Sequence, residues 1–343
     1  MMAARSAFVA GGAGAVLLSA VEGDVIGVDL GGTKVAVARL EGGAMAEPHT
    51  TPTERRSADG LIEQIVVGIE RVRGGGVAAV GIGVPSVVEF ATGRAKSSVN
   101  VPLRDVPLRR ILRERLDLPV YVDNDATCAA LAEAHDGDEL VTENLVMFTV
   151  GTGVGGGLVL GGRPYRGATG AAGELGHWIV GADLSGGAPA AGGFPQPGSL
   201  EILARGGTLD DLAAASGTAD PGGVLGRRAR EDGRATARDA VEAAREGDAE
   251  ARRLLRLIGE RLGVGIANAI NALDPEVVAV GGGVSAAGEL LLEPAREAAW
   301  RYVLPGVGER TEIRVARHGS DAGLLGAALL ARQERVLEFE GVA

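Results

Sequence analysis

The sequence predicts an α/β fold of two similar lobes that face each other across a cleft. Apolar runs typical of buried strands alternate with helical patterns along the chain. The glycine-containing stretch Asp29–Lys34 lies between two apolar runs, and Thr149–Leu160 repeats this plan of strand, Gly/Thr turn and return strand. Two such hairpins favour mixed sheets over a doubly wound parallel sheet, and they suggest a nucleotide bound between the lobes.

The composition limits the class of protein. The chain has 343 residues, enough for two domains with separate cores. It is 46% hydrophobic but 3% aromatic, so its core must be built from aliphatic side chains and close backbone contacts at its 56 glycines. A net charge of −11 argues against binding to nucleic acid. The single cysteine, Cys128, excludes an internal disulfide and fits a cytoplasmic protein.

Residues 1–24 have the outline of a signal peptide, because Arg5 precedes an apolar stretch that ends in small residues. The stretch is too short and too rich in glycine for a membrane span, so we expect no membrane association. A protein that binds a nucleotide, as the two hairpins suggest, gains nothing from export. We therefore predict a disordered extension over residues 1–24, with export as the alternative.

The small lobe is predicted to cover residues 25–138. Ser57 is a good helix N-cap, and apolar residues follow it at helical spacing until Gly74–Gly76 ends the pattern. In chain order we expect a hairpin over 25–40, a helix over 58–73, a strand over 77–84, a loop over 97–102, a helix over 108–116, a strand over 119–122 and a helix over 126–134.

The large lobe is predicted to cover residues 139–331, with its last helix packing back on the small lobe and a tail over 332–343. Glycine and proline predict loops over the cleft from 161 to 198. We expect a strand over 145–150, charged helices within 210–251 that break at 221–223 and 247, a long helix over 251–273, a strand over 277–280 and helices over 290–301 and 322–335.

The first glycine turn has the chemistry of a polyphosphate site. Gly31 and Gly32 let the backbone approach a bulky group and point its N–H groups outward. Thr33 adds a hydroxyl, Lys34 a positive charge, and Asp29 a carboxylate able to hold hydrated Mg²⁺. The alternative is a plain hairpin with glycine at its turn.

The pair Asn124–Asp125 is our candidate for the catalytic site, with Asp125 as the base. We expect Asp125 at a strand end just before a helix, where the helix N-terminus favours an ionised carboxylate. Such a carboxylate can accept the proton of a hydroxyl that attacks a phosphoryl group. The alternative is that these residues serve as a helix N-cap.

A second candidate segment is Glu174-Leu175-Gly176-His177. Glu174 and His177 lie on one face if the segment is helical, or converge if the turn is tight. A carboxylate and a neutral imidazole both form hydrogen bonds with sugar hydroxyls. The alternative is a salt bridge within a loop.

From about Val25 to Ala331 the ordered motifs of the chain resemble the ROK family of sugar kinases and repressors, which have the two-lobed actin-like/hexokinase (ribonuclease H-like) fold with mixed sheets. The motifs are the Asp29–Lys34 turn, Val122–Ala126, the block Gly170–His177 and Gly281–Ser285. The resemblance implies ATP as the phosphoryl donor, a homodimer and the base Asp125.

The resemblance also assigns roles to individual residues. It implies hexose binding by Asn100, Asn124, Asp125, Glu174, His177 and Glu201. It implies nucleotide binding by Asp29, Gly31, Gly32, Thr33, Lys34, Gly151, Thr152, Gly153, Gly155, Gly282 and Gly283, with the last two beside the adenosine end.

The sequence departs from the family pattern at three points. Zinc-containing members have three cysteines after the histidine, whereas Gly192–Ser199 contains none, so we predict no protein zinc site and a loop packed on Phe194 and prolines instead. Asp123 stands where the family usually has Glu, and Ser86 where it tends to have Gly. These changes leave the identity of the hexose open.

We therefore expect an ATP- and Mg²⁺-dependent kinase that phosphorylates glucose at its 6-hydroxyl. Fructose, mannose or an N-acetylhexosamine are the alternative substrates, and polyphosphate is the alternative donor. An alternative of another class is a catalytically silent sugar sensor, although Asp125 and the Asp29–Lys34 turn argue against it. A DNA-binding repressor would need a longer N-terminal segment and a less acidic chain.

Overall fold

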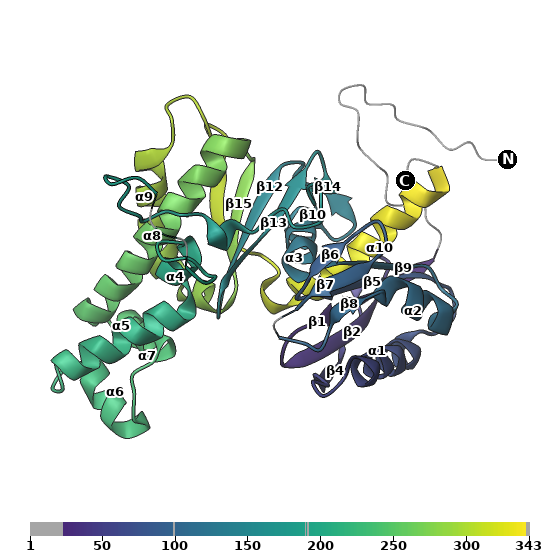
Figure 1. The fold of residues 1–343 in the computed structure, drawn as a ribbon, viewed down its shortest axis with the longest axis horizontal. Coiled ribbons are helices and arrows are strands. Elements are labelled where there is room, and N and C mark those ends of the chain that lie inside the picture. Colours follow the sequence, from purple (N-terminus) through teal and green to yellow (C-terminus); the bar gives the residue numbers. More distant parts are fainter. Residues whose placement is uncertain (1–22, 99, 189, 191, 341–343) are drawn as a thin grey trace.

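The computed structural model describes residues 23–98, 100–188, 190 and 192–340, and shows a small lobe and a large lobe (Figure 1). The predicted N-terminal extension lies almost entirely outside these residues. The strands are β1 Asp24–Leu30, β2 Lys34–Glu41, β3 Ala44–Met45, β4 His49–Pro52, β5 Val77–Val84, β6 Val87–Glu89, β7 Arg94–Ser97, β8 Arg104–Val106, β9 Val120–Asn124, β10 His135–Asp136, β11 Glu139–Leu140, β12 Leu145–Val150, β13 Val154–Leu160, β14 Arg163–Pro164, β15 Val277–Gly281 and β16 Glu312–Val315.

The helices occur in both lobes and between them. They are α1 Ala58–Val72, α2 Leu108–Leu116, α3 Asp125–Glu133, α4 Leu200–Ala204, α5 Gly206–Ala219, α6 Val224–Asp232, α7 Ala237–Arg245, α8 Ala249–Leu273, α9 Glu289–Tyr302 and α10 Ala322–Glu340. Short 3-10 helices are η2 Leu175–His177, η3 Gly283–Ala287 and η4 Gly319–Asp321. None of the helices within the described residues is long and apolar enough to cross a membrane.

The two main sheets share one plan, as the repeated hairpin predicts. The order in the small lobe is β3-β2-β1-β5-β9, where β1 is antiparallel to β2 and parallel to β5. The order in the large lobe is β14-β13-β12-β15-β16, where β12 is antiparallel to β13 and parallel to β15. Both sheets are therefore mixed, and each glycine turn joins the antiparallel pair of its own sheet.

Helices α3 and α10 form a middle layer between the two sheets. Their alanines and leucines share one buried cluster with Val25 and Ala79 of the first sheet and with Met147 and Ala279 of the second. The outer face of the first sheet packs on α1 and α2, and the outer face of the second packs on α8 and α9. In Figure 1, α1 and α2 lie at the right and α8 and α9 at the left.

Close backbone contacts at glycine make this middle layer possible. A Cβ at Gly81 of β5 would collide with the carbonyl oxygen of Ala327 in α10, and a Cβ at Gly326 of α10 would collide with the backbone of Cys128 in α3. Alanine and leucine then fill the small space that remains. This packing explains how a chain with few aromatic residues closes its core.

The structure differs from the sequence prediction at several elements. Helix α10 continues beyond Arg335, where the helix was predicted to end, and runs through the predicted tail as far as Glu340; Val336 and Leu337 are buried and extend its apolar face. Helix α3 begins at Asp125, one residue earlier than predicted, because Asn124 is its N-cap. The charged helical region also breaks at Gly233, which has a φ of 82°. Strand β16 was not predicted.

We predict that Gly326→Ala lowers the melting temperature, although alanine is the better helix former. The added methyl group would meet the backbone of Cys128, and overpacking of this kind costs about 1–3 kcal/mol of unfolding free energy. Gly75→Ala is the matched control, since nothing lies within 4 Å of a Cβ there. Thermal unfolding of the two variants measures the difference; an unchanged or higher value for Gly326→Ala would contradict the α3–α10 packing.

Candidate active site

A cavity of about 490 Å³ lies where the ends of β9 and β12 meet the start of α3. It combines residues from both sheets, from the loop before η2 and from α4. The predicted residues that line it are Asn100, Asn124, Asp125, Gly151, Thr152, Gly153, Gly155, Glu174, His177, Glu201 and Gly282.

The start of α3 holds the candidate base. The side-chain oxygen of Asn124 accepts hydrogen bonds from the backbone N–H groups of Ala126 at 2.9 Å and Thr127 at 3.1 Å, so Asn124 is the N-cap. Asp125 is the first helical residue, and its Oδ1 accepts from the N–H of Ala126 at 2.8 Å. Asn124 therefore fills the N-cap role, and the carboxyl group of Asp125 lines the cavity at the positive end of a helix.

The environment of Asp125 makes its carboxyl group a suitable base near neutral pH. The pKa of this group is raised to about 6: burial is the main cause, the negative charges of Asp29 and Glu174 add to it, and the hydrogen bond from Ala126 opposes it. Burial also raises the pKa of Asp29, against the nearby charge of Lys34. A base whose pKa lies close to the working pH transfers protons efficiently.

Glu174 and His177 flank η2 and face the same cavity. The Nε2 atom of His177 lies 3.7 Å from Oε2 of Glu174, which is a long contact for an ion pair. The Nδ1 atom of His177 is buried without a hydrogen-bond partner among the described residues. Both side chains therefore keep hydrogen-bonding capacity for a ligand.

Glu201 links the floor of the cavity to the second glycine turn. Ser199 caps α4, which places Glu201 in the first turn of that helix. Its Oε2 accepts a hydrogen bond from the N–H of Val154 at 2.8 Å, directly after the turn. Glu201 can therefore bind a ligand hydroxyl and hold the glycine turn with one carboxylate.

Ser86 contributes to the cavity through its backbone. Its hydroxyl donates to the carbonyl oxygen of Ser97 at 2.7 Å, while its own carbonyl accepts from Nδ2 of Asn124 at 3.4 Å. The serine thus has a local role in the turn that follows Pro85, and it orients the Asn124 side chain.

The loop that replaces the cysteine-containing segment is not packed in the way the sequence predicted. The Phe194 side chain is 79% exposed, and the contact recorded for its ring is with His177, edge-on, with ring centroids 5.6 Å apart. The expectation of a loop packed on Phe194 was therefore wrong. Within residues 23–98, 100–188, 190 and 192–340, no group of three or more His, Cys, Asp or Glu side chains is placed to hold a metal ion.

The first glycine turn lies beside the cavity rather than in its lining. None of Asp29, Gly31, Gly32, Thr33 and Lys34 lines it. The turn nevertheless lies next to the lining of the cavity, because a Cβ on Gly32 would lie 3.1 Å from Cβ of Asn100. The phosphate role of this turn stays a prediction.

A second cavity of about 820 Å³ adjoins the first, and the two share Gly151 and Thr152. Its walls include the apolar Leu209, Val241 and Val284. The polar groups around it are Arg205, Asp210, Arg238, Glu242 and Arg245, and Gly283 lies here. Gly283 was predicted from the sequence as a binding residue. The lining residues from α5 and α7 were not predicted, because the sequence there shows only a run of charged helical residues.

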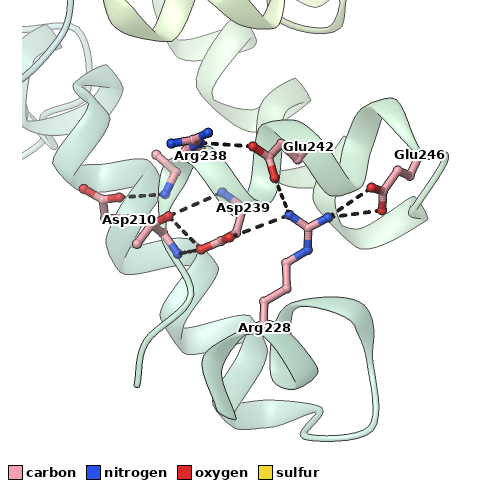
Figure 2. A network of polar contacts seen from close by, with 8 residues as sticks. Asp210, Arg228, Arg238, Asp239, Glu242 and Glu246 are labelled. Carbon is pink, nitrogen blue, oxygen red and sulfur yellow. Dashed lines mark hydrogen bonds and ion pairs between the residues drawn. The ribbon is translucent and has the colours of Figure 1, made fainter. Parts of the chain in front are cut away.

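Figure 2 shows the charge network that holds α7 in place. Arg228 of α6 reaches Glu242 at 2.8 Å and Glu246 at 3.1 Å, and Arg238 pairs with Glu242 at 3.0 Å. Oδ1 of Asp210 accepts a hydrogen bond from the N–H of Ala237 at 2.6 Å, which ties the start of α7 to α5. Because Arg238 and Glu242 also line the second cavity, this network fixes one of its walls.

Two lobes with matching mixed sheets, a buried helix pair between them and a cavity where the sheets meet define the actin-like/hexokinase fold. Comparison with known proteins identifies the family within this fold. The ROK family model matches residues 25–334, so the chain belongs to the ROK family.

Individual relatives cover almost the whole chain. A glucokinase of Halalkalibacterium halodurans is 37% identical over 317 residues, which cover 90% of this chain and 95% of that protein. The structure of a ROK family glucokinase from Streptomyces griseus, in complex with glucose and AMPPNP, is 33% identical with a TM-score of 0.74 and covers 91% of this chain and 100% of that one. A ROK hexokinase from Thermus thermophilus is 37% identical with a TM-score of 0.74 and covers 91% and 99%.

We predict that Asp125→Asn makes the protein more stable at pH 7.5. A carboxyl group whose folded-state pKa is about 6, above its unfolded value of 3.8, opposes folding increasingly as the pH rises from 3.8 to about 6, and opposes it in full above 6. The gain is at most about 3 kcal/mol, because one pKa unit corresponds to about 1.4 kcal/mol, and it shrinks as the pH falls below 6.

Melting temperatures of the variant and the original chain at pH 7.5 and pH 5 test this. The exposed Glu231→Gln is the control and should show no such pH-dependent difference. A lower melting temperature for Asp125→Asn at pH 7.5 would mean that the carboxylate stabilises the fold.

Proposed function

We propose that this chain is an ATP-dependent glucokinase that transfers the γ-phosphoryl group to the 6-hydroxyl of glucose. The observation that carries the proposal is the partly buried Asp125, with a pKa of about 6, at the junction of a hydroxyl-binding cavity and a glycine turn. Membership of the ROK family and identities above 30% to a glucokinase and a hexokinase over nine-tenths of the chain support it.

We assign the sugar to the first cavity. Asn100, Asn124, Glu174, His177 and Glu201 supply hydrogen-bond donors and acceptors from several directions, as a polyhydroxylated ring requires. Asp125 accepts the proton of the attacking 6-hydroxyl. With the hydroxyl held in place, much of the catalytic effect comes from positioning rather than from covalent chemistry.

We assign ATP to the second cavity and the glycine turns. The adenine ring of ATP would lie between Leu209, Val241 and Val284, and Gly282 and Gly283 would lie beside the adenosine. The backbone N–H groups around Gly151, Thr152, Gly153 and Gly155 would hold the phosphates at the boundary of the two cavities. Lobe closure would bring Gly31, Gly32, Thr33 and Lys34 onto the same phosphates.

Asp29 is the residue that suits Mg²⁺ bound with ATP. Its carboxyl group is largely buried, and it lies close enough to Asp125 for the negative charge of Asp29 to raise the pKa of Asp125. Magnesium in phosphoryl-transfer sites is held by one or two carboxylates, with water and phosphate oxygens as the other ligands. When bound, the ion would neutralise phosphate charge and relieve the repulsion between these carboxylates.

We also propose a homodimer located in the cytoplasm. Support comes from the resemblance to the family and from the single cysteine. Light scattering on the purified chain and fractionation of cells test these two statements; a monomeric or exported protein would contradict them.

The function is tested by coupled ADP release with ATP, Mg²⁺ and a panel of hexoses. We expect turnover on glucose and a loss of about 10²–10⁴-fold in kcat for Asp125→Asn, the usual contribution of a catalytic base. Turnover on fructose, mannose or an N-acetylhexosamine alone would keep the mechanism and change the substrate. Sugar binding without any turnover would instead establish a sensor, and turnover with polyphosphate but not ATP would change the donor.

We expect kcat/KM, which reports the protonation state of the free enzyme, to fall as the pH drops through about 6, because protonated Asp125 cannot accept the hydroxyl proton. Asp29→Asn should move this acid limb to lower pH, since it removes a negative charge that raises the pKa of Asp125. Glu231→Gln is the control. Rate profiles from pH 5 to 9 check both statements, and an acid limb that does not move in Asp29→Asn would argue against coupling of the two carboxyl groups.

A further inference from the structure

One buried arginine outside both cavities contacts three structural elements that the active site needs in register. We propose that Arg166 is a positioning residue that holds the strand end carrying the base and the loop carrying Glu174 in one fixed arrangement. This inference rests on the proposed function.

The first contact is with the residue next to the catalytic pair. Nε of Arg166 donates to Oδ2 of Asp123 at 2.6 Å, and Oδ1 of Asp123 accepts from the backbone N–H of Asn124 at 2.9 Å. The Asp123 side chain is almost fully buried. Arg166 therefore acts on the backbone at Asn124 through a single carboxylate.

The second contact is with the sugar loop, residues 166–174. The backbone carbonyl of Arg166 accepts a hydrogen bond from the N–H of Ala172 at 3.0 Å, which closes this segment on itself. Ala172 lines the first cavity, and so does Glu174. The backbone of Arg166 thus shapes the loop, while its side chain ties that loop to the end of β9.

The third contact is with the last helix. The second nitrogen of the guanidinium, Nη2, donates to Oε1 of Glu334 in α10 at 2.9 Å, and the guanidinium carbon lies 3.4 Å from the ring centroid of Phe90. The guanidinium carbon of Arg109 also lies 5.0 Å from the centroid of the Phe90 ring. Two carboxylates and an aromatic ring therefore surround a guanidinium whose side chain is 18% exposed.

A planar guanidinium is needed for this arrangement. It donates in two directions in a fixed geometry and stacks on a ring, whereas a lysine ammonium is a point charge on a flexible stem. Buried charge pairs of this kind contribute little net stability. They fix geometry because moving either partner away would leave an unpaired buried charge. The Arg166 guanidinium lies behind Asn124 and Asp125, so the fixed geometry of its contacts serves the reaction.

Arg166→Met should lower kcat and raise the KM for glucose, each by about tenfold or more, because small misplacements of reacting groups can cost about a hundredfold. The KM for ATP should change less than about twofold, since the nucleotide cavity contains no Arg166 contact. Arg166→Lys should recover only part of the loss, and Glu334→Gln, which keeps the shape of the side chain, should show a smaller effect of the same kind.

The matched control is Arg314→Met. Arg314 pairs at 2.6 Å with Glu133, a fully buried carboxylate at the other end of α3, and neither residue lines the two cavities. This variant should lose stability as Arg166→Met does, yet keep both KM values. Equal kinetic effects in the two arginine variants, or normal kinetics in Arg166→Met below its melting temperature, would overturn the proposal.

Hydrogen exchange provides a readout that does not depend on kinase activity. The amides of Asn124 and Ala172 should exchange faster in Arg166→Met and Glu334→Gln than in Arg314→Met. If the unmodified chain phosphorylates no hexose, the proposed function fails while this comparison still decides the positioning role. Unchanged exchange at both amides would reject it.

Discussion

The close approach of α3 and α10 is the constraint on which the active site depends. Glycines at the crossing points bring helix backbone directly against helix and strand backbone, so neither helix can shift without a collision. Asp125 is the first residue of α3, and its position is therefore set by the middle layer of the core rather than by a surface loop. A base placed in this way keeps its geometry while loops around it bind and release ligands.

The carboxylates of this site repel one another and would repel the phosphate groups of a ligand. Asp29, Asp125, Glu174 and Glu201 lie in or beside one cleft, and ATP brings further negative charge. The start of α3, the backbone N–H groups of the glycine turns, Lys34 and a bound cation are what can offset this charge. An acidic cleft of this kind favours a donor that arrives together with its metal ion over a bare polyanion.

The sequence predicted the architecture well because periodicity and glycine punctuation are local signals. The helix capped by Ser57 and the helix Leu108–Leu116 were predicted almost to the residue, the first from its N-cap and apolar spacing and the second from its apolar spacing alone. The predicted hydroxyl-binding residues meet around one cavity. By contrast, the α5–α7 wall of the second cavity and the partners of Arg166 depend on contacts between distant segments. The exposure of Phe194 likewise depends on tertiary packing that no local pattern records.

The position of α10 in the chain has a consequence for biosynthesis. The first sheet is assembled from residues up to Asn124, but one of its faces is covered in part by α10, which is translated long after that sheet. Until that helix leaves the ribosome, the apolar face formed by Val25 and Ala79 lacks the part of its cover that α10 provides. Domains usually fold from the N-terminus as they emerge. Here the lobe that is made first is completed only after the strands of the second lobe have been made, and part of its apolar surface stays exposed in the nascent protein until then.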